Sequence, residues 1–528
     1  MIIQNLIKNI LRLLRVFKYK ILYSKKLNFI KLFFINNFKE FKVDSPNSVI
    51  ILDPFQVPEW VITNSYFVNI LAKDKNSEIK TYSHNKRIKS PLVEEIFKSF
   101  NVSGHIETKI KDIGLLNSKT EILLNLRKTV DTKQKLYDLK IHDIWIGIDI
   151  YETYLKKQRP TIDFNDKFFW SILEQGVELL LFWENYFSVN SVSGVIVSHD
   201  CYNHMNILAK VAYKSNIPVY LPWALGVQKS DKPFDLYNDR FKNYKKYFNN
   251  LSDNEKIKAV EWSKGRLDLR LSGEVGVNMR YSTKSAFISN KSNENVLKVS
   301  ERIKVLIAVH DFFDNPHCYG EMLFTDFYEW LKFLVEVSSQ TNYDWYIKTH
   351  PDYSPAELHC LNDIVLNCSN IVLVPPETSW HQLAKEGLDF VLTCWGTVGH
   401  ELPLLGVQVI NASANNPHIA YEFNWHAASL KEYKEMLFDL DSLENKINKN
   451  DIYEFYYLWH SYTIVDNFIF DSYDKMIDNI TSKKMFSLKV YLYFINHLNS
   501  KKNTQIIDNM KLFIKSNKKN YFIKGPEN

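Results

Sequence analysis

The chain has 528 residues, of which 45% are hydrophobic and 24% charged, and a net charge of +6. This length exceeds what one hydrophobic core usually organises, so it predicts two or three domains, and the composition excludes a chain that is disordered throughout. The sequence contains no zinc-finger, helix-turn-helix or RNP pattern, so we expect no nucleic-acid partner.

Five cysteines are scattered without a C-x-x-C pair, at Cys201, Cys318, Cys360, Cys368 and Cys394. Such a set predicts reduced thiols and a cytoplasmic protein. Basic residues interrupt the apolar run near the N-terminus and no small-residue cleavage site follows, so no signal peptide is expected. No stretch of about 18–20 uncharged apolar residues occurs, so no membrane-spanning helix is expected.

Residues 2–19 combine apolar side chains at helical spacing with four basic ones, Lys8, Arg12, Arg15 and Lys18. This pattern predicts a basic amphipathic helix that lies on an anionic membrane surface. The alternative is a helix that packs on the protein's own core and turns its basic face to water. On the first interpretation the protein is cytoplasmic and peripheral on the inner face of the plasma membrane.

From residue 48 onward, apolar strands alternate with helices. The first series comprises a strand at 48–55, a helix to about residue 71, an apolar run that meets a helix at 144–155, a strand at 194–200, a helix at 203–216 and a strand at 217–222. Strands and helices that alternate at this spacing predict a parallel sheet. The polar segment NKSNEN at 290–295 is the best candidate for an interdomain linker.

A second series follows this linker. It comprises strands at 305–311, 344–351, 370–376, 389–394 and 407–412, and helices at 324–340, 379–387, 397–406 and 429–440, the last with Ser429 as its N-cap. The sequence therefore predicts an α/β protein with two Rossmann-like domains facing across a cleft and helical extensions at both ends. The expected boundaries are 1–45 for a basic amphipathic extension, 46–290 and 296–445 for the two domains, and 446–528 for a C-terminal helical segment.

Open parallel sheets bind ligands outside the carboxyl ends of their strands. In the second domain these ends carry His310, the KTHP motif with Lys348, His350 and Pro351, and the turn after Cys394. The imidazole of His350 is placed to contact a ligand, and its alternative role is that of a hydrogen-bonded loop histidine.

The turn after Cys394 carries Gly396, Thr397 and Glu401. Thr397 opens a predicted helix whose free N–H groups and dipole favour an anion. Gly396 permits close backbone approach, and the Glu401 carboxylate is placed to accept ribose hydroxyls. The alternative is that Thr397 is only an N-cap. Together the two motifs predict a nucleotide-binding site.

These motifs resemble those of the capsule polysaccharide biosynthesis family of glycosyltransferases, which includes the capsular Kdo transferases. The similarity is specific over about residues 300–420, where it rests on Lys348–Pro351 and on the block from Gly396 through Glu401 to Ile410. It is weaker over the first domain, where it rests on VSHDCYNH…IPVY and on RLSGEVGVNMRYSTKSAF at 270–287. It implies a GT-B-like fold, with an acceptor domain first and a nucleotide-sugar domain second. It also implies that His350, Pro351, Thr397 and more loosely Glu401 bind the donor nucleotide. Many relatives carry a Ser-Ser or Ser-Thr pair where this chain has a single Thr397, which leaves the donor nucleotide open.

A catalytic base is expected from the facing first domain. Asp53, Asp149, His199 and Asp200 all stand at or near strand ends. His199 and Asp200 are the best candidates, because both side chains can accept and release a proton and both follow a strongly apolar strand. For each, the alternative is a helix N-cap or turn residue.

The segment HDFFDNPH at 310–317 contains two His and two Asp residues, which suit a metal. Its spacing matches no standard zinc pattern, so we predict a loop of satisfied polar groups and no metal site.

The sequence thus predicts a metal-independent glycosyltransferase without a cofactor, which moves a sugar from a nucleotide-activated donor to a surface polysaccharide or lipid-linked acceptor. The resemblance favours a donor like CMP-Kdo. Two alternatives remain, a CDP-polyol phosphotransferase of the teichoic-acid type and a non-catalytic scaffold in a polysaccharide assembly complex.

Overall fold

A computed structural model describes residues 24–84, 91–223, 226–230, 241–279, 282–288, 294–366, 368–461, 469–470, 487–498 and 503–521. The amphipathic helix predicted at 2–19 lies outside these residues, and so does most of the predicted linker at 290–295.

The first sheet has the strand order β15-β8-β7-β6-β1-β2-β3. Its strands are β1 (Ser48–Leu52), β2 (Ser77–Ser83), β3 (Val102–Glu107), β6 (Val192–Ile196), β7 (Val219–Trp223), β8 (Gly226–Ser230) and β15 (Asn520–Tyr521). The five strands from β7 to β3 are parallel, and β8 and β15 add antiparallel pairs at the edge. Helices cover both faces, so strand β1 buries Ile50, Ile51 and Leu52 in succession rather than alternately.

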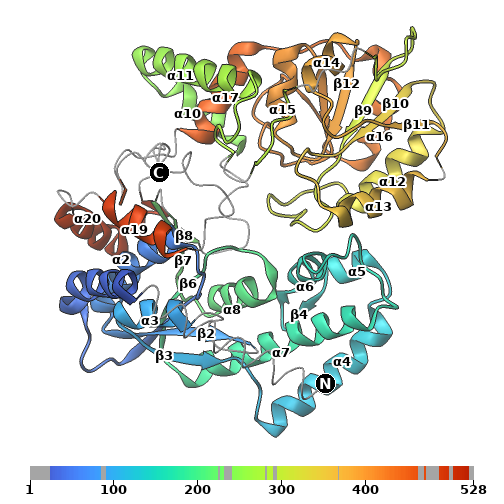
Figure 1. Cartoon of the computed structure of the whole chain (residues 1–528). Helices are drawn as coiled ribbons and strands as arrows, with labels where there is room; N and C mark the ends of the chain where they lie inside the picture. Colours follow the sequence, from blue (N-terminus) through green and yellow to red (C-terminus); the bar gives the residue numbers. More distant parts are fainter. Residues whose placement is uncertain are drawn as a thin grey trace.

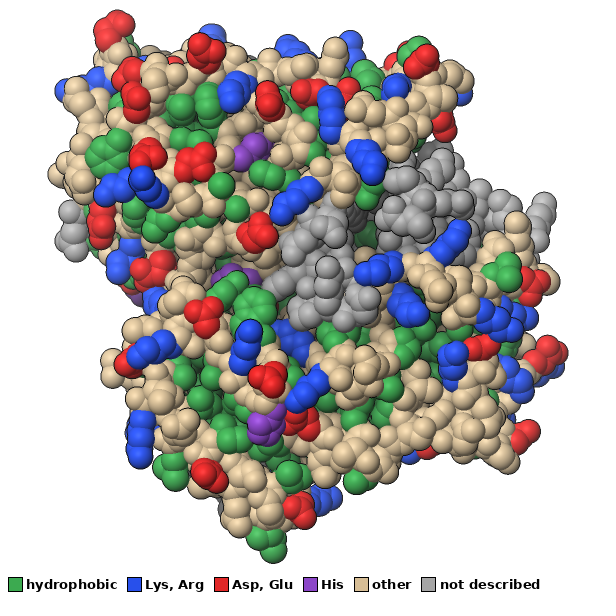
Figure 2. Space-filling view, turned by 180° about the vertical axis from the view of Figure 1, so that it is seen from behind, with side chains coloured by type: hydrophobic (Ala, Val, Ile, Leu, Met, Phe, Trp, Pro, Cys, Tyr) green, Lys and Arg blue, Asp and Glu red, His purple; other side chains and the backbone are tan. Residues whose placement is uncertain are grey.

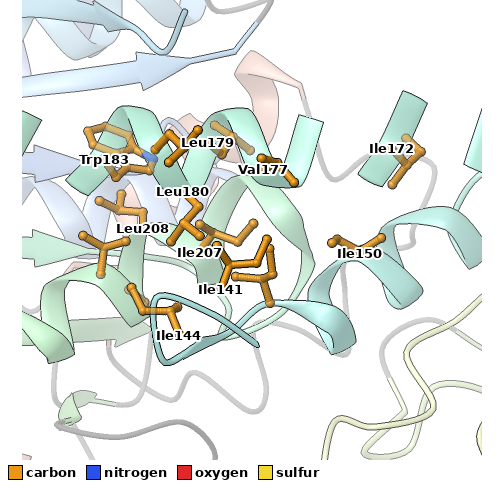
Figure 3. Close-up of a cluster of buried hydrophobic side chains, with 14 of the residues drawn as sticks. Ile141, Ile144, Ile150, Ile172, Val177, Leu179, Leu180, Trp183, Ile207 and Leu208 are labelled. Atoms are coloured by element: carbon orange, nitrogen blue, oxygen red, sulfur yellow. The ribbon is translucent and has the colours of Figure 1, made fainter. Parts of the chain in front are cut away.

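The helices of this domain are α2 (Pro58–Lys75), α3 (Pro91–Ser99), α4 (Ile113–Thr129), α5 (Lys133–Tyr137), α6 (Gly147–Leu155), α7 (Lys167–Val189), a π-helix η2 (Tyr202–Asn206) and α8 (Ile207–Lys214). Helix α7 buries Leu173, Val177 and Leu180 at helical spacing against α8 and the sheet. Figure 3 shows part of this core, where side chains of α6, α7 and α8 meet those of the short hairpin β4 (Lys140–Ile141) and β5 (Ile144–Trp145).

The second sheet is parallel throughout, with the order β11-β10-β9-β12-β13-β14. Its strands are β9 (Lys304–Ala308), β10 (Asp344–Lys348), β11 (Ile371–Leu373), β12 (Phe390–Thr393), β13 (Gln408–Asn411) and β14 (Trp425–His426). Taken in chain order this is 3-2-1-4-5-6, the Rossmann arrangement, in which the strand order reverses between β9 and β12. In the first sheet the same reversal falls between β1 and β6.

Helices again flank this sheet: α12 (Phe327–Ser338), α13 (Pro355–Val365), α14 (Trp380–Lys385), α15 (Val398–Glu401) with the 3₁₀ turn η3 (Leu402–Leu405), and α16 (Leu430–Phe438) with η4 (Leu440–Ser442). Ser429 caps α16, as predicted, by accepting a hydrogen bond from the Glu432 backbone N–H. The helix predicted at 397–406 is shorter than expected. It changes to 3₁₀ geometry at Leu402, because Pro403 has no N–H to continue the α-helical hydrogen bonds.

Helices α10 (Tyr244–Asn249) and α11 (Asp253–Leu271) precede the predicted linker, yet they pack against α17 (Lys449–His460) beside the second sheet (Figure 1). Tyr244 and Leu267 share a buried cluster with Phe423 and Phe455. The apolar faces of α10 and α11 are thus covered by α17 and by the segment before β14, rather than by the first sheet.

Both ends of the described chain return to the first domain (Figure 1). A helix at 24–38, followed by η1 (Lys39–Phe41), buries Leu27, Ile30 and Phe34 in the same cluster as α2. Helices α19 (Leu488–Asn496) and α20 (Asn503–Lys515) bury residues in this cluster too. None of the helices in the described ranges is long and apolar enough to cross a membrane.

The two domains touch through polar side chains. Tyr151 of α6 donates a hydrogen bond of 2.5 Å to Asp326, the N-cap of α12, and Lys156 pairs with Asp314 at 3.2 Å. Asp314 also acts electrostatically on His199, which follows β6. The residues after β6 and after β9 therefore face each other, and the structure confirms the predicted fold class of two Rossmann-like domains.

Candidate functional site

His310 follows β9 and braces the turn after β12. Its Nε2 accepts a hydrogen bond of 3.1 Å from the Cys394 backbone N–H and lies 2.8 Å from the Thr393 hydroxyl. The ring stacks on Phe327 at 4.6 Å, and burial lowers the pKa of His310 to about 4. His310, predicted to contact the donor, is therefore neutral at neutral pH and holds the turn in place.

Gly396 lies in this turn against the side chain of Thr393. Its backbone N–H donates to the Thr393 hydroxyl at 3.0 Å, and a Cβ at Gly396 would lie 2.8 Å from that oxygen. A side chain at this position would push the turn away from β12. The following helix α15 has only one turn, so its dipole is weaker than that of the longer helix predicted at 397–406.

Glu401 ends α15 in an ion pair with Arg270 of α11, and both side chains are at least nine-tenths buried. Burial alone would raise the pKa of Glu401, but the charge of Arg270 and hydrogen bonds from Arg270 and Thr397 hold that pKa below its usual value. The Thr397 hydroxyl therefore donates a hydrogen bond to the Glu401 carboxylate. The sequence did not predict Arg270, because its partner lies 131 residues away.

His350 follows β10 and is about half exposed. Its Nδ1 accepts a hydrogen bond of 3.0 Å from the Asp352 backbone N–H, so the ring proton of the neutral form sits on Nε2. The Asp352 carboxylate in turn accepts from the Thr283 backbone N–H at 2.7 Å. These bonds tie the segment 282–288 to the end of β10.

A small pocket lies between α11, the segment 282–288 and His350. Its lining includes Arg270, Glu274, Lys284, Ser285, Phe287 and His350. Glu401, Arg270 and Lys348 all act electrostatically on His350. His350, Glu401 and Arg270, the last not predicted as a site residue, therefore lie within electrostatic range of one another.

Lys348 is buried rather than exposed to a ligand. Its Nζ donates a hydrogen bond of 2.6 Å to the Pro376 carbonyl and lies 5.2 Å above the Trp380 ring. Burial lowers the pKa of Lys348 to about 8. The neighbouring Pro351 is also buried, so these two motif residues shape the loop that carries His350.

In the first domain, polar side chains gather where the strand order reverses, at the ends of β1 and β6. The Asp53 carboxylate accepts hydrogen bonds from the Ser198 hydroxyl and, at 3.2 Å, from the Ser198 backbone N–H. Burial raises the pKa of Asp53 to about 6, and these bonds oppose the rise. His199 Nδ1 lies 3.1 Å from the same hydroxyl oxygen.

Two aromatic rings hold His199. Its ring meets Phe55 at 5.0 Å edge-on and stacks with Trp60 at 6.2 Å. Burial lowers the pKa of His199 to about 4 and raises the pKa of the adjacent Asp200 carboxyl to about 6. Asp200 does not cap the following π-helix, whose N-cap position is Cys201.

Asp149 has a structural role, and its charge also acts on Asp200. It forms a fully buried ion pair of 2.7 Å with Lys210 and accepts a hydrogen bond of 2.7 Å from Asn206. These bonds fix α6 to η2 and α8.

The segment 310–317 is a loop whose polar side chains mostly have partners, although the buried His317 Nδ1 forms no hydrogen bond to any described residue and lies 3.3 Å from the Glu152 carboxylate. Asp311 accepts from the Phe313 backbone N–H at 2.9 Å, Asp314 pairs with Lys156, and His317 Nε2 bonds to the Thr325 carbonyl at 2.9 Å. Over the residues that the structure describes, no three His, Cys, Asp or Glu side chains form a set that could hold a metal ion.

No protein-family profile matches the sequence, and no curated protein matches it. Among solved structures, the chain is similar to KpsC of Thermosulfurimonas dismutans, a beta Kdo 2,4 transferase, with 11% identity, a TM-score of 0.29 and coverage of 50% of this chain and 79% of that one. It is also similar to HepE of Anabaena in complex with UDP and glucose, with 11% identity, a TM-score of 0.26 and coverage of 82% and 97%. A third is MnaA of S. aureus with UDP, with 11% identity, a TM-score of 0.23 and coverage of 85% and 98%. At such low TM-scores the fold assignment rests on the two sheets themselves.

Proposed function

We propose that this chain is a GT-B-type glycosyltransferase that moves a sugar from a nucleotide-activated donor to a surface polysaccharide or lipid-linked acceptor. One observation carries the proposal. In both Rossmann-like sheets, titratable side chains stand where the strand order reverses, and Asp314, which follows β9, acts electrostatically on His199, which follows β6. Ligands bind at such reversal points, so a donor on one domain meets an acceptor on the other.

The donor nucleotide binds to the second domain in this proposal. The His350 side chain is about half exposed, and its Nε2–H can donate to a phosphate or ribose oxygen. Beside it lies the buried ion pair of Arg270 and Glu401, and the Glu401 carboxylate also accepts a hydrogen bond from Thr397. The sequence resemblance favours a cytidine-activated donor of the CMP-Kdo kind, with no metal and no further cofactor.

The acceptor binds to the first domain, and its hydroxyl loses a proton to a base at the end of β6. Asp200 and His199 are the two candidates. His199 lies at the domain junction, within electrostatic range of Lys156 and Asp314, and Asp200 is the next residue along the chain. At neutral pH both groups are able to accept a proton, since their pKa values of about 6 and about 4 lie below 7.

The protein works at the inner face of the plasma membrane in this proposal. The helix at 24–38 buries one face and leaves Phe29, Leu32 and Ile35 exposed on another. Lysines outnumber acidic residues in residues 24–44 and in residues 503–521. Figure 2, seen from behind, shows Lys and Arg side chains gathered on the right of the lower half, the side that Figure 1 gives to this helix, α19 and α20. Exposed apolar side chains among lysines suit an anionic lipid surface.

A thermal-shift screen of CMP, CDP, UDP, GDP and their sugar conjugates tests the proposal. A ligand that binds only the native state adds about 2.7 kcal/mol of stability at a hundredfold excess over its dissociation constant. We expect one nucleotide and its sugar conjugate to raise the melting temperature. A CDP-polyol that stabilises the protein when no sugar conjugate does would instead favour phosphotransfer, and no shift with any of them would favour a scaffold.

A further inference from the structure

Three side chains at the ends of β1 and β6 form one continuous chain of hydrogen bonds. The Asp53 carboxylate is bonded to the Ser198 hydroxyl, which lies 3.1 Å from His199 Nδ1. Asp53 and Ser198 are more than nine-tenths buried, whereas His199 is partly exposed. The chain thus leads from the interior of the first domain to the domain junction.

The direction of these bonds follows from the inventory of donors. Asp53 Oδ2 also accepts from the Ser198 backbone N–H, so this oxygen acts as the acceptor of the hydroxyl proton as well. The Met205 sulfur lies 3.1 Å from the same hydroxyl, but a carboxylate is the far stronger acceptor. Since a hydroxyl has only one proton, Ser198 Oγ can only accept from His199. The proton of the neutral imidazole therefore sits on Nδ1, and Nε2 carries a lone pair.

The surroundings of Nε2 keep that lone pair free. Phe55 and Trp60 pack against the ring, and neither side chain has a hydrogen-bond acceptor that would favour a rotated ring. Over the described residues, no hydrogen bond to His199 Nε2 is formed. Lys156 and Asp314, which face the ring from α6's end and from the second domain, pair with each other at 3.2 Å.

We propose that Asp53 and Ser198 are positioning residues that hold His199 in the Nδ1–H form, with Nε2 as the base for the acceptor hydroxyl. This inference rests on the proposed function and decides between its two candidate bases. Asp53 and Ser198 do not touch the substrate; they act through the imidazole.

The step balances as a direct displacement. His199 Nε2 takes the proton of the acceptor hydroxyl while that oxygen forms its bond to the anomeric carbon of the donor. The bond from this carbon to the phosphate oxygen breaks, and the nucleotide leaves with the electron pair. The imidazolium then keeps its Nδ1–H on Ser198 and releases the Nε2 proton to water. A single displacement of this kind inverts the anomeric configuration.

The tautomer can be tested without any substrate. In protein labelled with ¹⁵N-histidine, two-bond ¹H–¹⁵N correlation spectra at pH 7 separate the Nδ1–H from the Nε2–H form, and the signals lost in His199→Gln identify the residue. We expect the Nδ1–H form in the native protein and in Ser198→Thr, which keeps the hydroxyl, and the loss of this preference in Ser198→Ala. The Nε2–H form in the native protein would overturn the relay whether or not the chain is a transferase.

Kinetics test the catalytic part, with the sugar nucleotide that stabilises the protein in the thermal screen, CMP-Kdo first. His199→Gln should lower kcat by about a hundredfold or more, the usual contribution of a general base. Ser198→Ala should lower kcat by less and leave KM for the donor unchanged, and Ser198→Thr should restore the rate. The proposal fails if His199→Gln keeps its rate while Asp200→Asn loses it, because Asp200 would then be the base. If no nucleotide binds, the proposed function fails, and the spectra still decide the relay.

Discussion

The side chains of Arg270 and Glu401 are almost wholly withdrawn from water, and they connect α11 to α15 beneath the pocket at His350. Removing one partner of such a pair leaves an uncompensated buried charge, which costs about 3–5 kcal/mol. We expect Glu401→Gln to lower the free energy of unfolding by about this amount in urea titrations at pH 7. Glu435→Gln, which breaks an exposed pair with Lys431, should change it by about 0.5 kcal/mol or less.

The same pair predicts a pH dependence. The pKa of Glu401 is lower in the folded protein than in the unfolded chain, so the stability it contributes is present above its unfolded pKa and is lost as the pH falls through the folded pKa. We expect the stability difference between native protein and Glu401→Gln to shrink on acidification below about pH 4. An unchanged difference at low pH would show that the carboxylate is not held in its charged form.

The sequence pattern predicts the residues at strand ends, but it does not predict which distant residues bond to them. His350, Thr397 and Glu401 follow from the rule that ligands bind at the carboxyl ends of parallel strands. Arg270 and Ser198 gain their roles from bonds to Glu401 and Asp53 that span 131 and 145 residues of chain. The burial of Lys348, which the KTHP motif suggested as a ligand, likewise depends on a carbonyl at Pro376 from another loop.

Among the elements, α6 begins where the backbone passes closest to α5. A Cβ at Gly147 would lie 1.8 Å from the Leu136 carbonyl oxygen and 2.7 Å from that of Tyr137. We expect Gly147→Ala to destabilise the protein by about 1–3 kcal/mol, because the α5–α6 contact must open. Gly265→Ala, inside α11 with no atom within 4 Å of the new Cβ, should instead stabilise it by about 0.5–1 kcal/mol. Equal effects of both substitutions on the urea midpoint would contradict the close approach.

The helix at 24–38 allows the membrane proposal to be tested on residues of known exposure. Phe29, Leu32 and Ile35 are 52%, 56% and 42% exposed, so their replacement by Ser should leave the fold intact. We expect the triple variant to sediment less with anionic vesicles than the native protein, since buried apolar area drives interfacial binding.

Ile113 and Leu124 on α4, which are 75% and 58% exposed, provide a control for this experiment. Their replacement by Ser should leave vesicle binding unchanged. Equal binding by the triple variant and the native protein would show that this face does not contact lipid. The predicted helix at 2–19 stays a prediction of its own, with Lys8, Arg12, Arg15 and Lys18 as the residues to neutralise.

Element prediction succeeded where a strand is buried on both faces. The apolar runs at 48–55, 305–311 and 389–394 became β1, β9 and β12 because nothing but a parallel sheet buries such runs at that length. At 144–155, where an apolar run was predicted to meet a helix, the structure has the two-residue strand β5 followed by helix α6. The side chains of α6 are buried all round, so they show no helical periodicity to mark its start.

At the scale of the whole molecule, two sheets of Rossmann order were readable from the alternation of strands and helices, whereas the packing of the parts was not. Helices α10 and α11 lie in the chain with the first domain and in space with α17. Strand β15 pairs with β8 from almost 300 residues away along the chain. Local patterns carry no information on such distant partners, because any apolar face satisfies the same burial requirement.

Nucleotide binding at the second domain is the central claim, and isothermal titration calorimetry of CMP against the native protein and His350→Ala tests it most directly. The half-exposed His350 ring makes one local hydrogen bond, from the Asp352 backbone N–H, so the variant should keep its fold and lose little of its melting temperature. Loss of a hydrogen bond to a charged phosphate costs about 1.5–3 kcal/mol, so its affinity should fall about tenfold or more. His359→Ala, an exposed histidine on α13, should bind CMP like the native protein. Unchanged affinity in His350→Ala, or no binding of CMP, CDP, UDP or GDP by the native protein, would contradict the account.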